Sequence, residues 1–192
     1  MKGKLKTRDL IYAGAFGAVY LILMLVIVMG SGIVPVLYIL SPLTVGVICA
    51  TVYMLYVIKI KKFGAILILA VLFGLVSSVN SVYALAWTVL TGIVAELIAR
   101  AGKYQSKKMF MVSYWIFNLN MIGPFLMLIY AKQQFIDMCV EYYGKDYAAA
   151  VDALTPSWII FALAGLAVVG AVIGTLLASG FIRKHFEKAG VV

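Results

Sequence analysis

The stretch that decides the fold is LIYAGAFGAVYLILMLVIVM, residues 10–29. Its twenty residues carry no charge, and a helix of that length crosses a hydrocarbon core of about 30 Å. The first half contains two small-residue pairs, Ala13 with Gly17 and Gly14 with Ala18. Residues four apart lie on one face of a helix, and small side chains let another helix approach closely. We therefore expect a membrane-spanning helix whose first half docks a partner and whose bulky second half faces lipid.

The composition of the whole chain agrees with this interpretation. Of 192 residues, 65% are hydrophobic and 12% are charged, whereas about a quarter of the residues are charged in soluble domains. The chain is therefore predicted to be an all-α integral membrane protein with a single domain, residues 1–192. The basic start precedes an apolar run that is too long for the core of a cleavable signal peptide.

Length and flanking charge predict six membrane-spanning helices in one bundle. They cover about residues 10–29, 36–58, 63–78, 82–99, 109–131 and 157–182. The four prolines lie at or near the ends or breaks of these spans, where a missing amide donor is tolerated. Gly123 and Pro124 predict a kink within the fifth span.

The distribution of basic residues predicts the orientation of the bundle. Fourteen of the sixteen lysines and arginines fall in the amino-terminal tail, residues 59–62, residues 100–108 and the carboxyl-terminal tail. With six spans these segments share one side, and the excess of positive charge places that side and both termini in the cytoplasm. The net charge of +9 is spread in short blocks between apolar spans, so we expect no nucleic-acid partner.

The longest connection on the opposite side, the outer loop 132–156, has its own pattern. Phe135, Met138, Tyr142 and Tyr147 recur there at helical spacing, which predicts one or two short amphipathic helices. Such a segment either lies at the membrane interface or covers a cavity, and both interpretations remain open at this point.

Polar and aromatic residues near the outer ends of spans four to six are candidates for a substrate site, because polar groups are costly within a membrane. The predicted substrate-binding residues are Asn80, Tyr83, Trp87, Trp115, Asn118, Asn120 and Trp158, and the predicted gate residues are Tyr38, Tyr142 and Tyr147. Their rings would stack on a flat ligand and their polar atoms would bind its edges. Since Asn118 and Asn120 are two apart, at most one faces a central cavity. The aromatic residues alternatively form the interfacial belt.

Other chemistries lack the residues that they need. Glu96 is the only acid inside a predicted span, and we expect it to pair with Arg100 one turn away. The sequence has neither the mid-membrane acid of an ion-coupled carrier nor a phosphate-binding glycine loop with lysine. Cys49, Cys139 and His185 form no metal-binding pattern. We expect no catalytic residues, no metal and no bound cofactor.

The whole chain resembles the substrate-binding S components of energy-coupling-factor (ECF) transporters in its length, its six predicted spans and the small-residue pairs of its first span. These pairs look like the family's alanine-rich docking motif, with glycine at two of the four positions. Within that group, TRDLIYAGAFGAVY (residues 7–20), Ser41 with Pro42, and KFGAIL (residues 62–67) look like the Trep_Strep (MptaB) subgroup.

The resemblance implies a function and a set of partners. An S component lies in the bacterial cell membrane and binds a vitamin-like or cofactor-like small molecule in an outward-facing pocket. It delivers the molecule by docking its first span, here through Ala13, Gly14, Gly17 and Ala18, on a membrane T subunit. A pair of cytoplasmic ATPases uses the ATP, so this chain itself is expected not to be an enzyme.

Two alternatives use the same residues differently. One is a stand-alone small-molecule carrier or channel that needs no ATPase. The other is a structural or sensory membrane protein, for example a homo-oligomer held together by the face of span six that carries Gly170, Gly174 and Ala178. The sequence does not identify the substrate, although a flat aromatic cofactor fits the number of aromatic residues.

Overall fold

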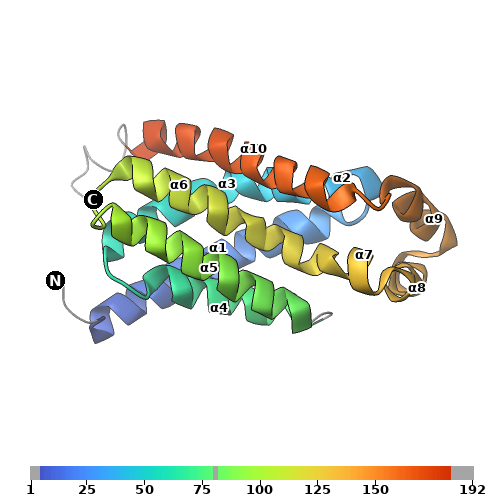
Figure 1. Cartoon of the computed structure of the whole chain (residues 1–192), viewed down its shortest axis with the longest axis horizontal. Helices are drawn as coiled ribbons and strands as arrows, with labels where there is room; N and C mark the ends of the chain where they lie inside the picture. The colour runs from blue at the N-terminus through green and yellow to red at the C-terminus, as the bar shows by residue number, and fades with distance from the viewer. Residues whose placement is uncertain (1–4, 80–81, 183–192) are drawn as a thin grey trace.

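The computed structural model describes residues 5–79 and 82–182, which fold as one bundle of helices (Figure 1). In chain order the elements are α1 (Thr7–Ser31), α2 (Pro35–Ile39), α3 (Ser41–Ile60), α4 (Ala65–Ser77), α5 (Val82–Ala101), α6 (Lys107–Phe117), the 3-10 helix η1 (Asn118–Leu126), α7 (Met127–Tyr130), α8 (Lys132–Tyr143), α9 (Lys145–Leu154) and α10 (Ile159–Phe181). The described chain contains helices and no strand, so the all-α prediction is confirmed.

Five segments of the described chain are long and apolar enough to cross a membrane. They are Thr7–Ser31, Ser41–Ile60, Tyr83–Ala101, Lys107–Tyr130 and Ile159–Phe181. The third predicted span, residues 63–78, forms α4, and its 13 residues are fewer than the roughly 20 that cross a hydrocarbon core. Five of the six predicted spans thus have a matching helix, and a sixth crossing by α4 stays a prediction.

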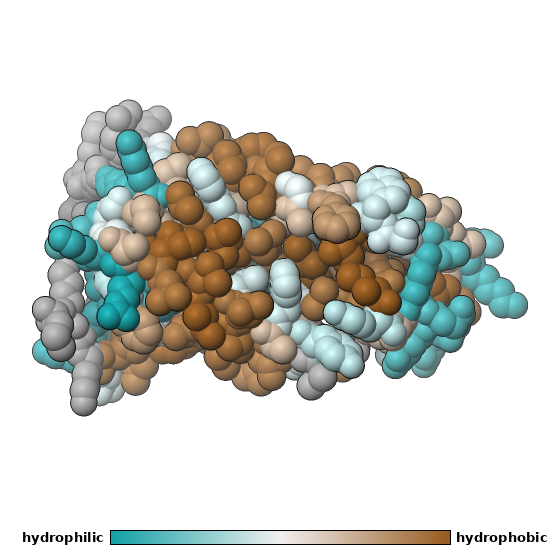
Figure 2. Space-filling model, in the orientation of Figure 1, coloured by the Kyte–Doolittle hydropathy of each residue, from teal (hydrophilic) through white to brown (hydrophobic). Residues whose placement is uncertain are grey.

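On the face shown in Figure 2, the bundle is mostly apolar along its middle and polar at both ends. The first residues of α1, α4 and α6 lie at one end together with the last residues of α3, α5 and α10 (Figure 1). We call this the basic end, because residues 59–62 and 100–108 lie there. We call the opposite end, where α2, α8 and α9 lie, the capped end.

Buried Glu96 of α5 fixes the start of α4. One carboxylate oxygen of Glu96 accepts hydrogen bonds from the amides of Ile66 at 2.9 Å and Leu67 at 3.3 Å. Its other oxygen accepts a hydrogen bond from the hydroxyl of Tyr104 at 2.7 Å. A helix leaves its first amides unsatisfied and has a positive amino-terminal end, so a carboxylate stabilises it there.

The expected pair of Glu96 with Arg100 is therefore replaced by other contacts. Glu96 is 0% exposed and turns toward α4, whereas the guanidinium of Arg100 lies 5.6 Å from the centroid of the Phe63 ring. The prediction from spacing was wrong because it considered one helix alone. The amides at the start of a neighbouring helix compete for the same carboxylate.

Glycines bring the backbones of α3 and α10 into direct contact. A Cβ atom on Gly170 would lie 2.3 Å from the carbonyl oxygen of Leu43, and one on Gly174 would lie 2.3 Å from that of Gly46. Gly170, Gly174 and Ala178 are buried. The face of span six that was considered for homo-oligomer contacts is thus occupied by α3 of the same chain.

A second close contact joins α4 to α5. A Cβ atom on Gly92 would lie 2.3 Å from the Cβ atom of Ala70, and one on Gly74 would lie 2.3 Å from the hydroxyl oxygen of Thr88. The hydrophobic effect does not drive helices together in lipid. Close van der Waals packing of this kind therefore stabilises the contact between α4 and α5.

The fifth predicted span changes its winding halfway. It is α-helical to Phe117, and then follows the nine-residue 3-10 helix η1, which contains Pro124. The predicted kink at Gly123 and Pro124 is thus spread over more than two turns. Runs of 3-10 helix longer than three or four residues are uncommon, so neighbouring helices have to support this segment.

Gly170→Ala is expected to destabilise the bundle, because the new Cβ atom would meet backbone atoms of Leu43 that cannot move independently of α3. Overpacking of this kind costs about 1–3 kcal/mol, more than the helix propensity gained by replacing glycine, which is up to about 1 kcal/mol. The measurement is thermal unfolding of the purified protein in detergent. Gly165→Ala is the matched control on the same helix, since no atom lies within 4 Å of its added Cβ. Equal melting temperatures for the two variants would contradict the contact.

Candidate functional site

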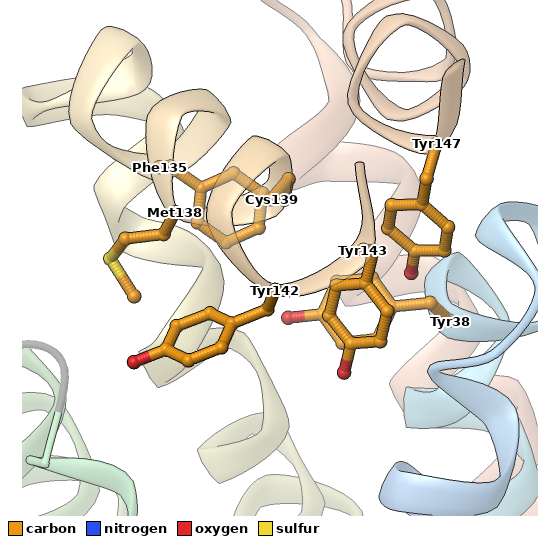
Figure 3. A pocket seen from close by; sticks show the side chains of 7 residues that line it. All are labelled: Tyr38, Phe135, Met138, Cys139, Tyr142, Tyr143 and Tyr147. Carbon is orange, nitrogen blue, oxygen red and sulfur yellow. The ribbon is translucent and has the colours of Figure 1, made fainter. Parts of the chain in front are cut away.

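Two cavities meet at Tyr38 at the capped end of the bundle. The first, which we call the tyrosine cavity, has a volume of about 150 Å³ and lies under α8 and α9 (Figure 3). Its lining residues are Tyr38, Phe135, Met138, Cys139, Tyr142, Tyr143 and Tyr147. The second, the Ser41 cavity, has a volume of about 200 Å³, and Tyr38 lines it as well. A single ring therefore borders both spaces.

Short helices position the lining of the tyrosine cavity. Helix α2 has a proline in its first turn, where the fixed φ of proline favours helix formation, and it carries Tyr38. Helices α8 and α9 meet at Gly144, whose φ of 90° is one that residues with a side chain rarely adopt. Phe135 and Cys139 of α8 and Val151 of α9 are buried in one apolar cluster. This cluster holds α8 and α9 over the end of the bundle.

Aromatic rings dominate the geometry of the tyrosine cavity. The Tyr38 ring centroid lies 5.0 Å from that of Phe125 and 6.5 Å from that of Phe135. The rings of Tyr143 and Tyr147 stack with centroids 4.5 Å apart. Aromatic pairs prefer such tilted or offset arrangements. The rings thus pack in two groups at the cavity, one around Tyr38 and one formed by Tyr143 and Tyr147.

Burial keeps three lining groups of the cavity, Tyr38, Cys139 and Tyr147, neutral at physiological pH. Burial raises the pKa of Tyr38. Burial and the nearby Tyr143 hydroxyl together raise the pKa of Tyr147 to about 12. Burial also raises the pKa of the Cys139 thiol. The lining therefore offers ring faces, phenol hydroxyls, a thioether and a protonated thiol, and it can bind a ligand by stacking and hydrogen bonding.

The Ser41 cavity is mostly apolar with one unsatisfied polar atom. Met24, Phe73 and Met121 contribute to its walls. The hydroxyl oxygen of Ser41 is buried and makes no hydrogen bond with the part of the chain that the structure describes. A buried polar group without a partner costs free energy, so Ser41 favours occupation of the cavity by water or by a ligand with a hydrogen-bonding group.

The structure brings together the three residues that were predicted as gates. Tyr38, Tyr142 and Tyr147 all line the tyrosine cavity, although they come from three separate helices (Figure 3). Tyr142 is 70% exposed, whereas Tyr38 and Tyr147 are half-buried. A gating role for these residues stays a prediction.

Three of the predicted substrate-binding residues support η1 instead of lining either cavity. The indole nitrogen of Trp87 donates to the carbonyl of Leu119 at 2.8 Å. The side-chain amide of Asn118 donates to the carbonyls of Pro42 and Ala167 at 3.0 and 2.8 Å. Asn120 accepts a hydrogen bond from the hydroxyl of Thr91. The two asparagines thus face opposite neighbours, and each binds another helix.

The remaining predicted substrate-binding residues are dispersed. The indole nitrogen of Trp115 donates to the hydroxyl of Thr175 at 3.0 Å. Tyr83 and Trp158 are 55% and 60% exposed, and Asn80 lies outside the described residues. The three described ones line neither cavity, and a role of any of these four in binding substrate remains a prediction.

Sequence reasoning missed several residues that line the two cavities. They include Ser41, Phe125, Phe135, Met138 and Tyr143. Phe135 and Met138 shared the helical spacing of Tyr142, so their signal was present and was interpreted only as an amphipathic face. Ser41 and Phe125 gave no such signal, because only the packing of α2 and η1 places them at a cavity.

The predicted docking strip is divided between two faces of α1. Ala13 and Gly17 are buried, and a Cβ atom on Gly17 would lie 3.2 Å from the side chain of Leu72 in α4. Gly14 and Ala18 are exposed, and in the described part of the chain no atom outside the backbone of α1 itself lies within 4 Å of a Cβ built on Gly14. The pair of Gly14 and Ala18 therefore remains accessible to another protein.

The described residues contain no group of three or more His, Cys, Asp or Glu side chains that could hold a metal ion. Cys49 and Cys139 are both free thiols. The candidate site therefore consists of the two cavities at the capped end.

Small thiol reagents test this geometry. Methyl methanethiosulfonate is expected to label Cys139, which borders the tyrosine cavity, and to leave Cys49, which is 0% exposed, unlabelled until the protein unfolds. Thiolate is the reactive form, and burial raises the pKa of Cys139. The labelling rate of Cys139 should therefore be low at neutral pH. It should still rise above about pH 8.5, where the labelling rate of an exposed thiol levels off. Mass spectrometry with Cys139→Ser as control measures this, and labelling of Cys49 first would contradict the structure.

Comparison with known proteins gives one result. Neither a curated protein nor a solved structure matches the chain. The sequence profile of a family described as a hypothetical bacterial integral membrane protein, Trep_Strep, matches residues 7–188. This match covers most of the chain and agrees with its five long apolar helices. The chain therefore belongs to the Trep_Strep family of bacterial integral membrane proteins.

Proposed function

We propose that the protein is the substrate-binding subunit of an ECF-type importer. In this role it binds a vitamin-like or cofactor-like small molecule at the capped end. It then delivers the molecule, chemically unchanged, by docking on a membrane T subunit. A separate pair of ATPases hydrolyses the ATP, and this chain has no catalytic activity of its own.

The observation that carries the proposal is the contrast between the capped end and the centre of the bundle. The capped end has two cavities that share Tyr38. The centre is filled by rings that are at most 1% exposed: those of Tyr20, Tyr53, Tyr114 and Phe117. Their centroids are 4.8 to 5.8 Å apart where they touch. Such a bundle can hold a ligand at one end, and a partner has to supply the energy that moves it inward.

The charges of the two ends support an orientation. Positive charge collects on the cytoplasmic side of membrane proteins, so the basic end is the cytoplasmic one and the capped end faces outward. With α4 as a sixth, shorter crossing, both termini lie in the cytoplasm. The tyrosine cavity then opens to the compartment from which a nutrient arrives.

Helix α1 provides the docking surface in this proposal. Gly14 and Ala18 lie in its half near the basic end and are exposed. Small residues let a partner helix approach closely, and van der Waals packing of this kind can be released again. The same half of α1 is fixed to the bundle by Asp9, whose carboxylate pairs with Lys62 at 2.5 Å.

Gly14→Leu is expected to abolish uptake and to reduce co-purification with the T and ATPase subunits about fivefold or more, since overpacking a close contact costs about 1–3 kcal/mol. The variant should keep its melting temperature, because no atom of the described residues outside its own helical turn lies within 4 Å of a Cβ built on Gly14. Gly30→Leu is the matched control: it is another open glycine on α1, near the capped end.

Two results would count against the proposal. One is normal complex formation by Gly14→Leu. The other is ligand transport by the purified chain in proteoliposomes without any ATPase, which would favour the stand-alone carrier. Gly17→Leu is less informative as a docking test, since it also disturbs the packing of α1 on Leu72.

A further inference from the structure

We propose that the tyrosine cavity binds a small organic cation, an alkylated ammonium or a protonated amine, through the faces of its rings. The inference deepens the proposed function by naming the class of substrate, and it rests on that function only for the statement that the bound cation is imported. The binding itself follows from the lining, the charges around it and the size of the cavity.

The lining is suited to a cation. Four tyrosines and Phe135 border the cavity, and the thioether of Met138 adds a soft, polarisable group. The face of an aromatic ring carries partial negative charge and attracts a cation within about 6 Å of its centroid. The rings attract a cation through their faces, without the desolvation cost of a buried carboxylate.

The charges around the cavity have the sign that a cation needs. The chain as a whole has a net charge of +9, but residues 132–156 carry four acids and two lysines. Lys132 is engaged with Asp152 at 2.7 Å. Glu141 directly precedes Tyr142, and Asp146 directly precedes Tyr147. This segment therefore has a net charge of −2, and exposed negative charges attract cations over about 8–10 Å.

Other ligand classes fit less well. Among the described residues, no lysine, arginine or histidine lines the tyrosine cavity, so an anion would be buried there without a counter-charge, which is costly. The volume of about 150 Å³ is below the 300–1,000 Å³ that is usual for drug-sized ligands. A compact, rounded group such as a trimethylammonium head suits this space and the ring faces around it.

The test compares choline with its neutral isostere 3,3-dimethylbutan-1-ol, using the full chain in lipid nanodiscs and isothermal calorimetry. Choline is expected to bind about threefold to thirtyfold more tightly than the isostere, the range that cation–π attraction supplies. Tyr142→Phe keeps the ring and should keep this preference, whereas Tyr142→Leu should lose it. Tyr142 is 70% exposed, so neither change disturbs the core.

Two further variants complete the test. Tyr130→Leu is the matched control: Tyr130 is a 66% exposed tyrosine whose ring packs against that of Tyr83, and it lines neither cavity. It should leave choline affinity unchanged. Glu141→Gln combined with Asp146→Asn should weaken choline binding severalfold at low salt and little at high salt, because salt screens exposed charges.

Three outcomes would overturn the cation assignment: equal affinity for choline and the isostere, no binding of either probe, or tighter binding of a neutral flat ring such as adenine. They are distinguishable from failure of the proposed function. If the chain assembles with T and ATPase subunits but does not bind choline, only the assignment of substrate class is wrong. If the chain binds choline but does not assemble with T and ATPase subunits, only the assignment as a transporter subunit is wrong.

Discussion

Where α3 crosses α10, the carbonyl oxygens of Leu43 and Gly46 occupy the space that Cβ atoms on Gly170 and Gly174 would need. Side chains would hold the two helices apart, so the bundle can close only with glycine at these positions. The same contact explains Asn118. Its amide donates to carbonyls of both helices, and a Cβ atom on Gly46 would lie 2.6 Å from that amide nitrogen. The close approach of the α3 and α10 backbones and the bridge that Asn118 forms between the two helices therefore depend on each other.

The bridge through Asn118 has a consequence for the capped end, since this residue is also the first of η1. Non-α backbone is tolerated at membrane depth only where protein surrounds it. Trp87 satisfies one η1 carbonyl, and Thr91 bonds Asn120. Phe125 lies near the end of this supported segment, where it contacts Tyr38 and borders the Ser41 cavity. The walls of the candidate site thus depend on the glycine contact deeper in the bundle.

Much of the fold could be predicted from the sequence, because uncharged runs of about twenty residues have few alternatives to a membrane-spanning helix. The positions of five long helices followed from this rule, and the helical spacing of apolar residues predicted the short helices in 132–156. This rule does not predict the hydrogen-bond partners of Glu96, Asn118 and Asn120. A polar residue in a membrane protein binds whatever unsatisfied group lies nearest, often on another helix. Spacing within one helix cannot reveal that group, so polar residues expected at a substrate were found between helices.

Helix α1 links the two surfaces that the proposed function needs. Its half near the basic end exposes Gly14 and Ala18, and its half near the capped end contributes Met24, Leu25 and Val28 to the Ser41 cavity. Gly14 and Met24 are ten residues apart, or about 15 Å along a helix. A helix of this length moves largely as a rigid body, so a partner that tilts α1 at Gly14 also displaces one wall of the Ser41 cavity. Tyr38 borders both cavities, and such a tilt would therefore change the fit of a bound ligand without any opening through the aromatic centre of the bundle.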